Sequence, residues 1–201
     1  MDQESGLRER LIDVGVELVT SEGTAALGLR EIARRAGVSH GAPRRYFATH
    51  HALLSAIARR GFEELGSRIP AAMAGPGADD PRGQVRALGR AYVGYALEHR
   101  GMFELMFRHD LLDGSGQDGP PGGRLRDSTL PLFELLVSLV ARCAATEAPR
   151  ITAAALWANL HGVAQLWAWG SLPLVLDGDP AASVDRVVDA ALDAHLPGHR
   201  R

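Results

Sequence analysis

Arginine side chains gather in one short stretch of this chain. Residues 24–60 hold seven arginines and one carboxylate, Glu31, whereas the whole chain has a formal net charge of −2. Guanidinium groups pair well with phosphate oxygens, and a concentrated positive surface on an otherwise acidic protein is typical of nucleic-acid binding. The stretch therefore predicts a DNA-binding surface, although Arg34 and Arg35 could simply solvate a helix face. The seven residues are Arg30, Arg34, Arg35, Arg44, Arg45, Arg59 and Arg60.

Two short helices are expected to position these charges. Apolar residues recur at helical spacing in the first of them: Leu29, Ile32, Ala33 and Ala36. Gly37 follows where a helix takes a left-handed end, and Ser39 offers an N-cap oxygen to a second helix, expected over Ser39–Tyr46. Two short helices joined by a tight turn form a helix-turn-helix, whose second helix enters the major groove of DNA.

Residues 7–65 resemble the DNA-binding domain of the TetR-type transcriptional repressors. The resemblance lies in the Leu/Val stripe of a first helix, the run Arg30–Ser39, and the later positions Gly41, Phe47 and Leu53-Leu54. Three positions depart from the usual pattern of that family. Gly28 stands where a Thr or Ser usually caps a helix, Arg44 stands where a Tyr usually touches a phosphate, and His50 stands where a Lys usually opens the fourth helix.

The motif and the resemblance together imply a set of DNA-contacting residues. Early residues of the second helix should face the bases, where Ala42 or Pro43 could touch a thymine methyl group. Arg44 lies late in that helix, so we favour a phosphate contact for it over a guanine contact. The expected DNA-binding residues are Arg30, Ser39, His40, Gly41, Ala42, Pro43, Arg44, Arg45, Tyr46 and His50.

The rest of the chain shows helical periodicity and no strand pattern, which predicts an all-α fold of about nine helices. We expect a helix-turn-helix DNA-binding domain over residues 1–48, a connecting helix over 49–73, and a ligand-binding and dimerisation bundle over 74–201. Within these, Thr49, Asp80 and Asp179 suit helix N-caps, Pro70 should interrupt the regular hydrogen bonding of the connecting helix, and Gly101 should break the next helix. The other expected helices lie over residues 5–21, 81–99, 102–111, 124–146, 151–169 and 180–196, with Pro131 either kinking the fourth of these or starting it. Residues 113–123 should form a loop.

The middle of the chain is rich in aromatic and methionine residues, a composition that favours an apolar ligand cavity. The alternative for each of them is an ordinary core position. Trp157, His161 and Gly162 form a Trp-x-x-x-His-Gly motif that resembles one C-terminal subtype of the TetR-type repressors. That helix could line the cavity or pack against its two-fold mate, and His161 could anchor a ligand or lie in the core. The expected cavity residues are Tyr95, Phe103, Met106, Phe107, Phe133, Trp157 and His161.

The apolar faces of the last two long helices predict a homodimer. The residues concerned are Leu156, Leu160, Val163 and Leu166, with Val184, Val187, Val188, Ala191 and Leu192. His99, His109 and His161 fall on separate expected helices without ligand spacing, so we expect no metal site. We also find no catalytic motif and expect no cofactor.

The single cysteine, Cys143, excludes an intrachain disulfide and reads as a structural thiol. The start of the chain lacks a signal-peptide pattern and no apolar run is long enough for a membrane span, so we expect a cytoplasmic protein. The sequence thus predicts a homodimeric repressor of the TetR type that binds a palindromic operator and is released by a small apolar or amphipathic effector. An activator or a regulator without a ligand remains an alternative, and an enzyme built on a helical bundle is disfavoured.

Overall fold

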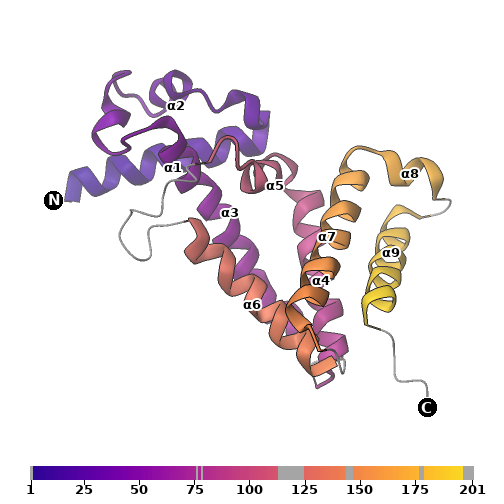
Figure 1. Ribbon diagram of the computed structural model, residues 1–201. Helices are drawn as coiled ribbons and strands as arrows, with labels where there is room; N and C mark the ends of the chain where they lie inside the picture. Colours follow the sequence, from indigo (N-terminus) through magenta and orange to yellow (C-terminus); the bar gives the residue numbers. More distant parts are fainter. Residues whose placement is uncertain are drawn as a thin grey trace, which may run out of the picture. The chain divides into compact units, whose positions relative to one another are not determined.

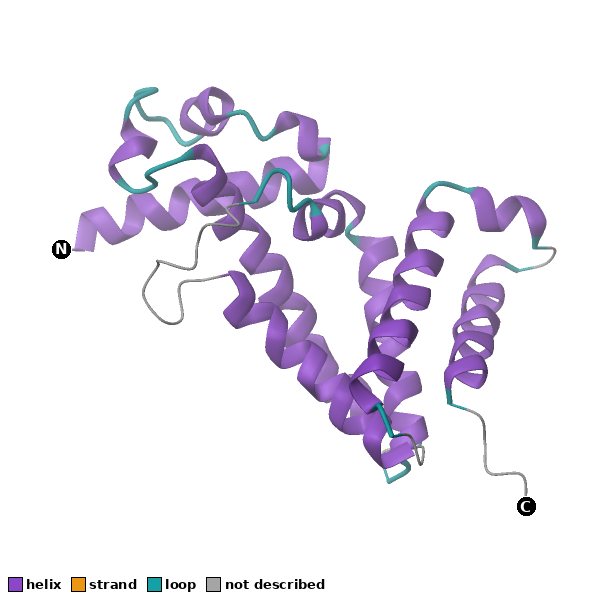
Figure 2. Cartoon of the chain, viewed as in Figure 1, coloured by secondary structure: helices purple, strands orange, loops and turns teal. Residues whose placement is uncertain are grey.

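The computed structural model describes residues 2–75, 77, 79–112, 125–143, 147–176 and 179–196. Over these residues the chain is helical and contains no strand, which confirms the all-α prediction (Figure 1, Figure 2). The expected loop over residues 113–123 falls outside the described residues. The α-helices are α1 (Asp2–Glu22), α2 (Leu29–Arg35), α3 (His50–Met73), α4 (Pro81–Glu98), α5 (Arg100–Phe107), α6 (Leu125–Cys143), α7 (Pro149–Ala168), α8 (Ser171–Val175) and α9 (Pro180–His195). Two short 3-10 helices, η1 (Thr24–Ala26) and η2 (Ala42–Arg45), flank α2.

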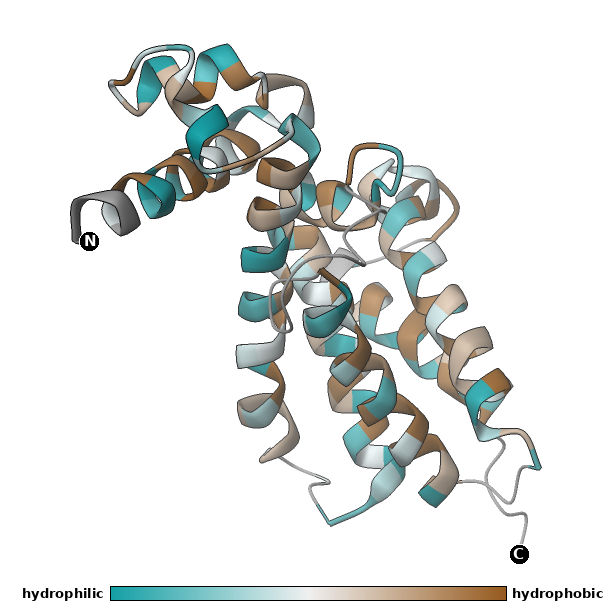
Figure 3. Cartoon of the chain, turned by 60° about the vertical axis from the view of Figure 1, so that its left-hand side comes forward, coloured by the Kyte–Doolittle hydropathy of each residue, from teal (hydrophilic) through white to brown (hydrophobic). Residues whose placement is uncertain are grey.

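The helices group into two compact units. The first comprises the described parts of residues 1–64 and 99–129, and the second those of 65–98 and 130–201. Helix α3 contributes to both units, and α5 belongs with the helix-turn-helix although it follows α4 in the chain. Along the helices, apolar residues are interspersed with polar ones (Figure 3).

Helix N-caps form where short polar side chains were expected. The Thr49 hydroxyl accepts from the amide of Ala52 at 3.0 Å, which starts α3. The Asp80 carboxylate accepts from the amide of Gly83 at 3.0 Å at the start of α4. Asp179 accepts from the amide of Ala182 at 3.1 Å at the start of α9. Each cap satisfies a backbone donor that has no partner within its own helix.

Two prolines lie inside helices. We expected Pro70 to interrupt the regular hydrogen bonding of α3, and the helix continues past it to Met73. A proline removes one backbone donor, and the residues after it still donate to carbonyls one turn back, as Ala74 does to Pro70 at 3.1 Å. Helix α6 likewise runs through Pro131, so that residue neither starts the helix nor ends it.

Gly101 allows a close approach of two helices rather than breaking one. The chain leaves helical geometry at His99, and Gly101 lies within α5. A Cβ atom at Gly101 would stand 2.2 Å from the carbonyl oxygen of Val19. The absent side chain therefore lets α5 pack directly on the backbone of α1, and the expectation of a break at Gly101 is wrong.

The core of the second unit is built from the end of α3 together with α4, α6, α7 and α9. Arginines of α4 hold α9 through ion pairs: Arg82 with Asp193, Arg86 with Asp189 at 2.7 Å, and Arg90 with Asp185 at 3.1 Å. Most residues expected at the dimer surface lie in this core, because α7 and α9 turn them toward α4. Residues with at most 6 % exposure cannot contact another subunit, so that part of the prediction is wrong for Leu156, Leu160, Val163, Val188, Ala191 and Leu192.

Candidate nucleic-acid interface

The turn after α2 has the geometry of a Schellman C-cap. Gly37 has a φ of 67°, its amide donates to the carbonyl of Arg34 at 3.1 Å, and the amide of Val38 donates to the carbonyl of Ala33 at 3.0 Å. Glycine adopts this left-handed conformation without strain, so the expected helix end at Gly37 is confirmed. The turn redirects the chain into η2.

The second element of the motif is shorter than expected. Instead of an α-helix over Ser39–Tyr46, the structure has the 3-10 helix Ala42–Arg45. A helix capped by Ser39 would need the residue four positions later to donate to the Ser39 carbonyl, and that residue is Pro43, which has no N–H. The Ser39 carbonyl accepts from the amide of Ala42 at 2.9 Å instead, and the N-cap residue of η2 is Gly41, without a side-chain cap.

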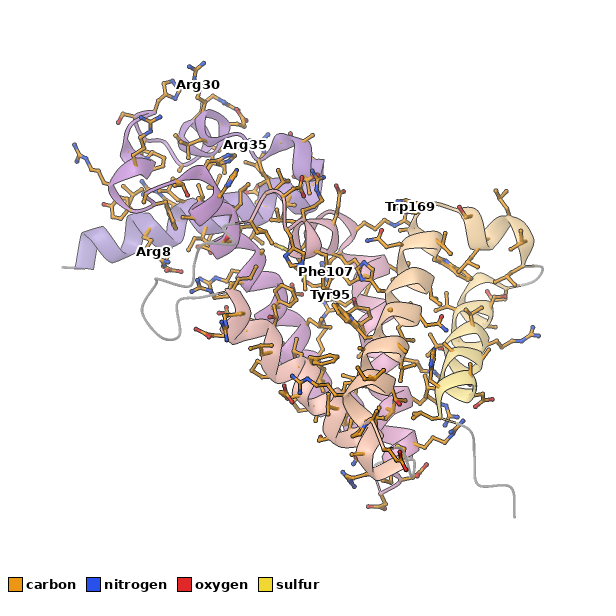
Figure 4. The ribbon with its side chains drawn as sticks, in the orientation of Figure 1. Arg8, Arg30, Arg35, Tyr95, Phe107 and Trp169 are labelled. Carbon is orange, nitrogen blue, oxygen red and sulfur yellow. The ribbon has the colours of Figure 1, made fainter. Side chains whose placement is uncertain are left out.

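Most of the expected DNA-contacting residues lie on the surface. Arg30, Ser39, His40, Gly41, Arg44 and Arg45 are exposed, and Ala42, Tyr46 and His50 are half-buried. Figure 4 shows the Arg30 side chain projecting away from α2. Pro43 is buried in the protein and cannot present its ring to a thymine methyl group, so this part of the expectation is wrong. Ala42 keeps that possibility.

His50 is held by the loop that precedes α2. Its Nε2 atom lies 2.6 Å from the carbonyl oxygen of Leu27. A carbonyl oxygen can only accept, so Nε2 carries the proton in this contact. His50 therefore fixes the first turn of α3 against the loop, and its other ring nitrogen can donate to a phosphate only when the ring carries a second proton.

Internal ion pairs neutralise part of the arginine cluster. Arg34 donates two hydrogen bonds to Glu31, at 2.9 and 2.6 Å, and Arg35 donates to Glu31 at 2.8 Å and also to Glu22. These guanidinium groups hold the pKa of the Glu31 carboxyl down at about 2, so the carboxylate is ionised at neutral pH.

The remaining arginines of the motif differ in this respect. In the part of the chain that the structure describes, Arg30, Arg44 and Arg45 have no carboxylate partner. They lie at the start of α2 and in η2. The positive charge available to DNA phosphates is therefore concentrated on these three side chains.

Comparisons with known proteins agree with this geometry. Residues 11–57 match the model of the bacterial regulatory proteins of the tetR family, and residues 85–191 match the tetracyclin repressor-like C-terminal domain. The chain belongs to the TetR family. That family is one of transcriptional regulators with an N-terminal helix-turn-helix, and not of enzymes.

Curated TetR-family regulators match this chain over only part of its length. The HTH-type transcriptional regulator BetI of Yersinia pestis is 33 % identical over 81 residues, or 40 % of this chain and 41 % of the relative. The chain thus spans about two fifths of the length of the curated relatives it matches.

Solved structures match over nearly the whole chain. A protein of unknown function from Rhodococcus sp. RHA1 is 32 % identical with a TM-score of 0.70, and the match covers 94 % of this chain and 93 % of that one. The multidrug binding protein EbrR, solved with imidazole, is 25 % identical with a TM-score of 0.59, covering 96 % and 92 %.

The residues expected to line a ligand cavity of this TetR-family chain fall into two groups. Phe103, Met106 and Phe107 lie on α5 in the first unit, where Phe107 packs against Phe62 with ring centres 5.6 Å apart. The other four, Tyr95, Phe133, Trp157 and His161, lie in the second unit. That some of these residues line a ligand cavity remains a prediction.

A hydrogen-bonded aromatic cluster lies in the second unit, formed by Tyr92, Phe133, Trp157 and His161. The Trp157 indole N–H donates to the Tyr92 hydroxyl at 3.1 Å, and that hydroxyl lies 2.8 Å from Nδ1 of His161. Burial lowers the pKa of His161, which favours its neutral form. Neutral His161 can then accept a hydrogen bond from the Tyr92 hydroxyl at Nδ1. Phe133 packs edge-on against Trp157 at 6.0 Å.

The sequence analysis did not identify the role of Tyr92 in the aromatic cluster or that of Glu31 in the ion pairs. Tyr92, the centre of the aromatic cluster, was not among the expected ligand residues. Glu31 was counted as the one acid in a basic stretch, but it precedes Arg34 and Arg35 by three and four residues, the spacing at which helix side chains meet. That spacing could have shown the internal ion pairs.

The described residues also bear on metal binding and on membrane insertion. No group of three or more His, Cys, Asp or Glu side chains is placed to hold a metal ion. No helix among them has the length and apolarity that a membrane crossing requires.

Proposed function

We propose that this chain is a ligand-responsive transcriptional repressor that binds a palindromic operator as a homodimer. The observation that carries the proposal is the set of three exposed arginines without carboxylate partners, Arg30, Arg44 and Arg45, on a helix-turn-helix of a TetR-family chain. One such motif reads few base pairs, so specific binding needs two half-sites about one helical turn apart.

We assign the dimer contact to the outward side of α7 and its continuation. This side carries Ala155, Ala158, Gly162, Leu166 and Trp169, of which Leu166 is 41 % and Trp169 is 72 % exposed. A Cβ atom at Gly162 would meet nothing within 4 Å, so this face is open in the single chain. Large exposed apolar residues at helical spacing support an interface with a second copy.

We assign effector binding to the C-terminal half. The aromatic cluster, with Trp157 38 % exposed, supplies apolar rings around a few polar atoms, which suits a small apolar or amphipathic molecule. EbrR, a structural relative of this chain, is a multidrug binding protein by its description. Effector binding would shift the population of the dimer toward a state in which the two motifs no longer match the half-sites.

Selection of bound sequences from a random duplex pool tests the DNA-binding part. We expect an inverted repeat with half-sites about 10 base pairs apart from centre to centre, bound by a dimer. No enrichment of any sequence, with no binding at low salt, would contradict the proposal.

A compound screen against the selected operator tests the effector part. We expect an apolar or amphipathic compound to release DNA and to quench the fluorescence of Trp157. A reporter gene behind the operator gives the sign: expression that falls when the regulator is removed would identify an activator in place of a repressor.

A further inference from the structure

Glu31 holds two arginines of the helix-turn-helix in a compact ion-pair network. Both carboxylate oxygens accept from the Arg34 guanidinium in a two-point contact, and the Arg35 Nε donates to the same carboxylate at 2.8 Å. Arg35 also reaches Glu22, the last residue of α1. The network thus ties four charged side chains from the end of α1 and from α2.

These groups are near the surface and can exchange partners. The Arg34 side chain is 65 % exposed, and those of Glu31 and Arg35 are about one third exposed. Ion pairs at such positions contribute little to stability, so a phosphate could replace the carboxylate at a small cost. Arg34 and Arg35 occupy the last turn of α2, next to the Gly37 turn that leads into η2. In a helix-turn-helix the first helix crosses the DNA backbone.

From this arrangement we infer that Glu31 competes with DNA phosphates for Arg34 and Arg35. This competition weakens the non-specific binding of DNA. The inference rests on the proposed DNA binding. With Glu31 in place, non-specific attraction comes mainly from Arg30, Arg44 and Arg45. Since backbone contacts carry no sequence information, withholding two of them lowers the affinity for DNA of any sequence, random DNA included.

The test measures binding of the full chain to a random-sequence duplex of about 30 base pairs, from about 50 to about 200 mM salt. We expect Glu31→Gln to bind several-fold more tightly than the unmodified chain at the lowest salt. Its logarithmic salt slope should be steeper by about one for each arginine that gains a phosphate. Glu22→Gln frees Arg35 from one partner only and should give a smaller change.

Two controls separate release of the arginines from a simple loss of negative charge. Asp13→Asn removes one charge from α1 in the same unit without touching Arg34 or Arg35, and should change the affinity less than Glu31→Gln. In a background of Arg34→Gln and Arg35→Gln, the further change Glu31→Gln should have no effect on the salt slope, because the arginines it would release are absent.

Each outcome decides between the alternatives. Unchanged or weaker binding by Glu31→Gln, while the unmodified chain binds the duplex, overturns the role of Glu31 and leaves the proposed function intact. An equal gain with and without the two arginines also overturns it, because general repulsion then explains the effect. An unmodified chain that binds no duplex at any salt overturns both proposals.

Discussion

Arg44 is the residue for which the family resemblance and the structure together give the most specific prediction of a DNA contact. It is exposed in η2, and no carboxylate in the described part of the chain engages it. We expect Arg44→Ala to weaken binding to operator and scrambled DNA about equally and to reduce the salt slope by about one per subunit, since it removes a phosphate contact. Binding titrations over a salt series measure both quantities.

Arg34→Ala is the matched control for Arg44→Ala, because Glu31 already engages the Arg34 side chain. It should change the slope less. A loss of about 1–3 kcal/mol confined to one base position would instead identify Arg44 as a base-reading residue. Unchanged affinity on both DNAs would remove it from the interface.

His161 should make the stability of the second unit depend on pH. Burial lowers its pKa in the folded protein below the value of about 6.5 for an unfolded chain. The folded state therefore binds fewer protons than the unfolded state. The stability that neutral His161 contributes is fully present above about pH 6.5 and is lost as the pH drops through the folded-state pKa. We expect the urea midpoint of the unmodified chain to fall more between about pH 7.5 and about pH 5 than that of His161→Gln. Parallel pH profiles for the two proteins would refute this.

At the scale of elements, the contact of α5 with α1 depends on one missing side chain. An alanine at Gly101 would place Cβ against the Val19 carbonyl, so the helices must separate, and we expect a loss of about 1–3 kcal/mol in the free energy of unfolding. Urea unfolding measures it.

Gly94→Ala is the control for Gly101→Ala. It lies inside α4 with nothing within 4 Å of its Cβ position, and should raise stability by about 0.5–1 kcal/mol. Equal stability of Gly101→Ala and the unmodified chain would mean that α5 does not pack closely on α1.

The helices were predictable where an apolar stripe and a cap coincide. Leu11 and Leu18, which belong to the Leu/Val stripe of α1, are fully buried, and Thr49 caps α3. The effects of glycine and proline on where helices end were harder to predict. Gly101 is explained by a partner 82 positions earlier, Val19, and no local pattern reveals such a contact.

The candidate site was predictable in its residue types but not in its pairing. Exposure of Arg30, Arg44 and Arg45 follows from the motif, and the shortened second element follows from Pro43, whose position four residues after Ser39 forbids the expected helical bond. Which arginines are neutralised depends partly on Glu22, which comes from another helix. The Tyr92 contact with His161 joins residues 69 positions apart and needs the fold to be seen.

At the scale of the whole molecule, dimerisation through α7 can be tested by charge. Leu166→Asp places a carboxylate on the proposed interface, where burial without a partner is costly, and should yield monomers by light scattering together with a large loss of operator affinity. Leu130→Asp alters a residue that is equally exposed but lies on α6, and should leave the dimer unchanged. A dimer that survives Leu166→Asp with full affinity would place the interface elsewhere.

Helix α3 is one continuous element that serves two compact units, with the division falling between Glu64 and Leu65. Its amide protons can therefore report on both units within a single stretch of backbone. If the units open independently, hydrogen–deuterium exchange should show one protection level for the amides before the division and another for those between it and Pro70. Binding of operator DNA should slow exchange first in the earlier segment, whereas an effector should slow it first in the later one.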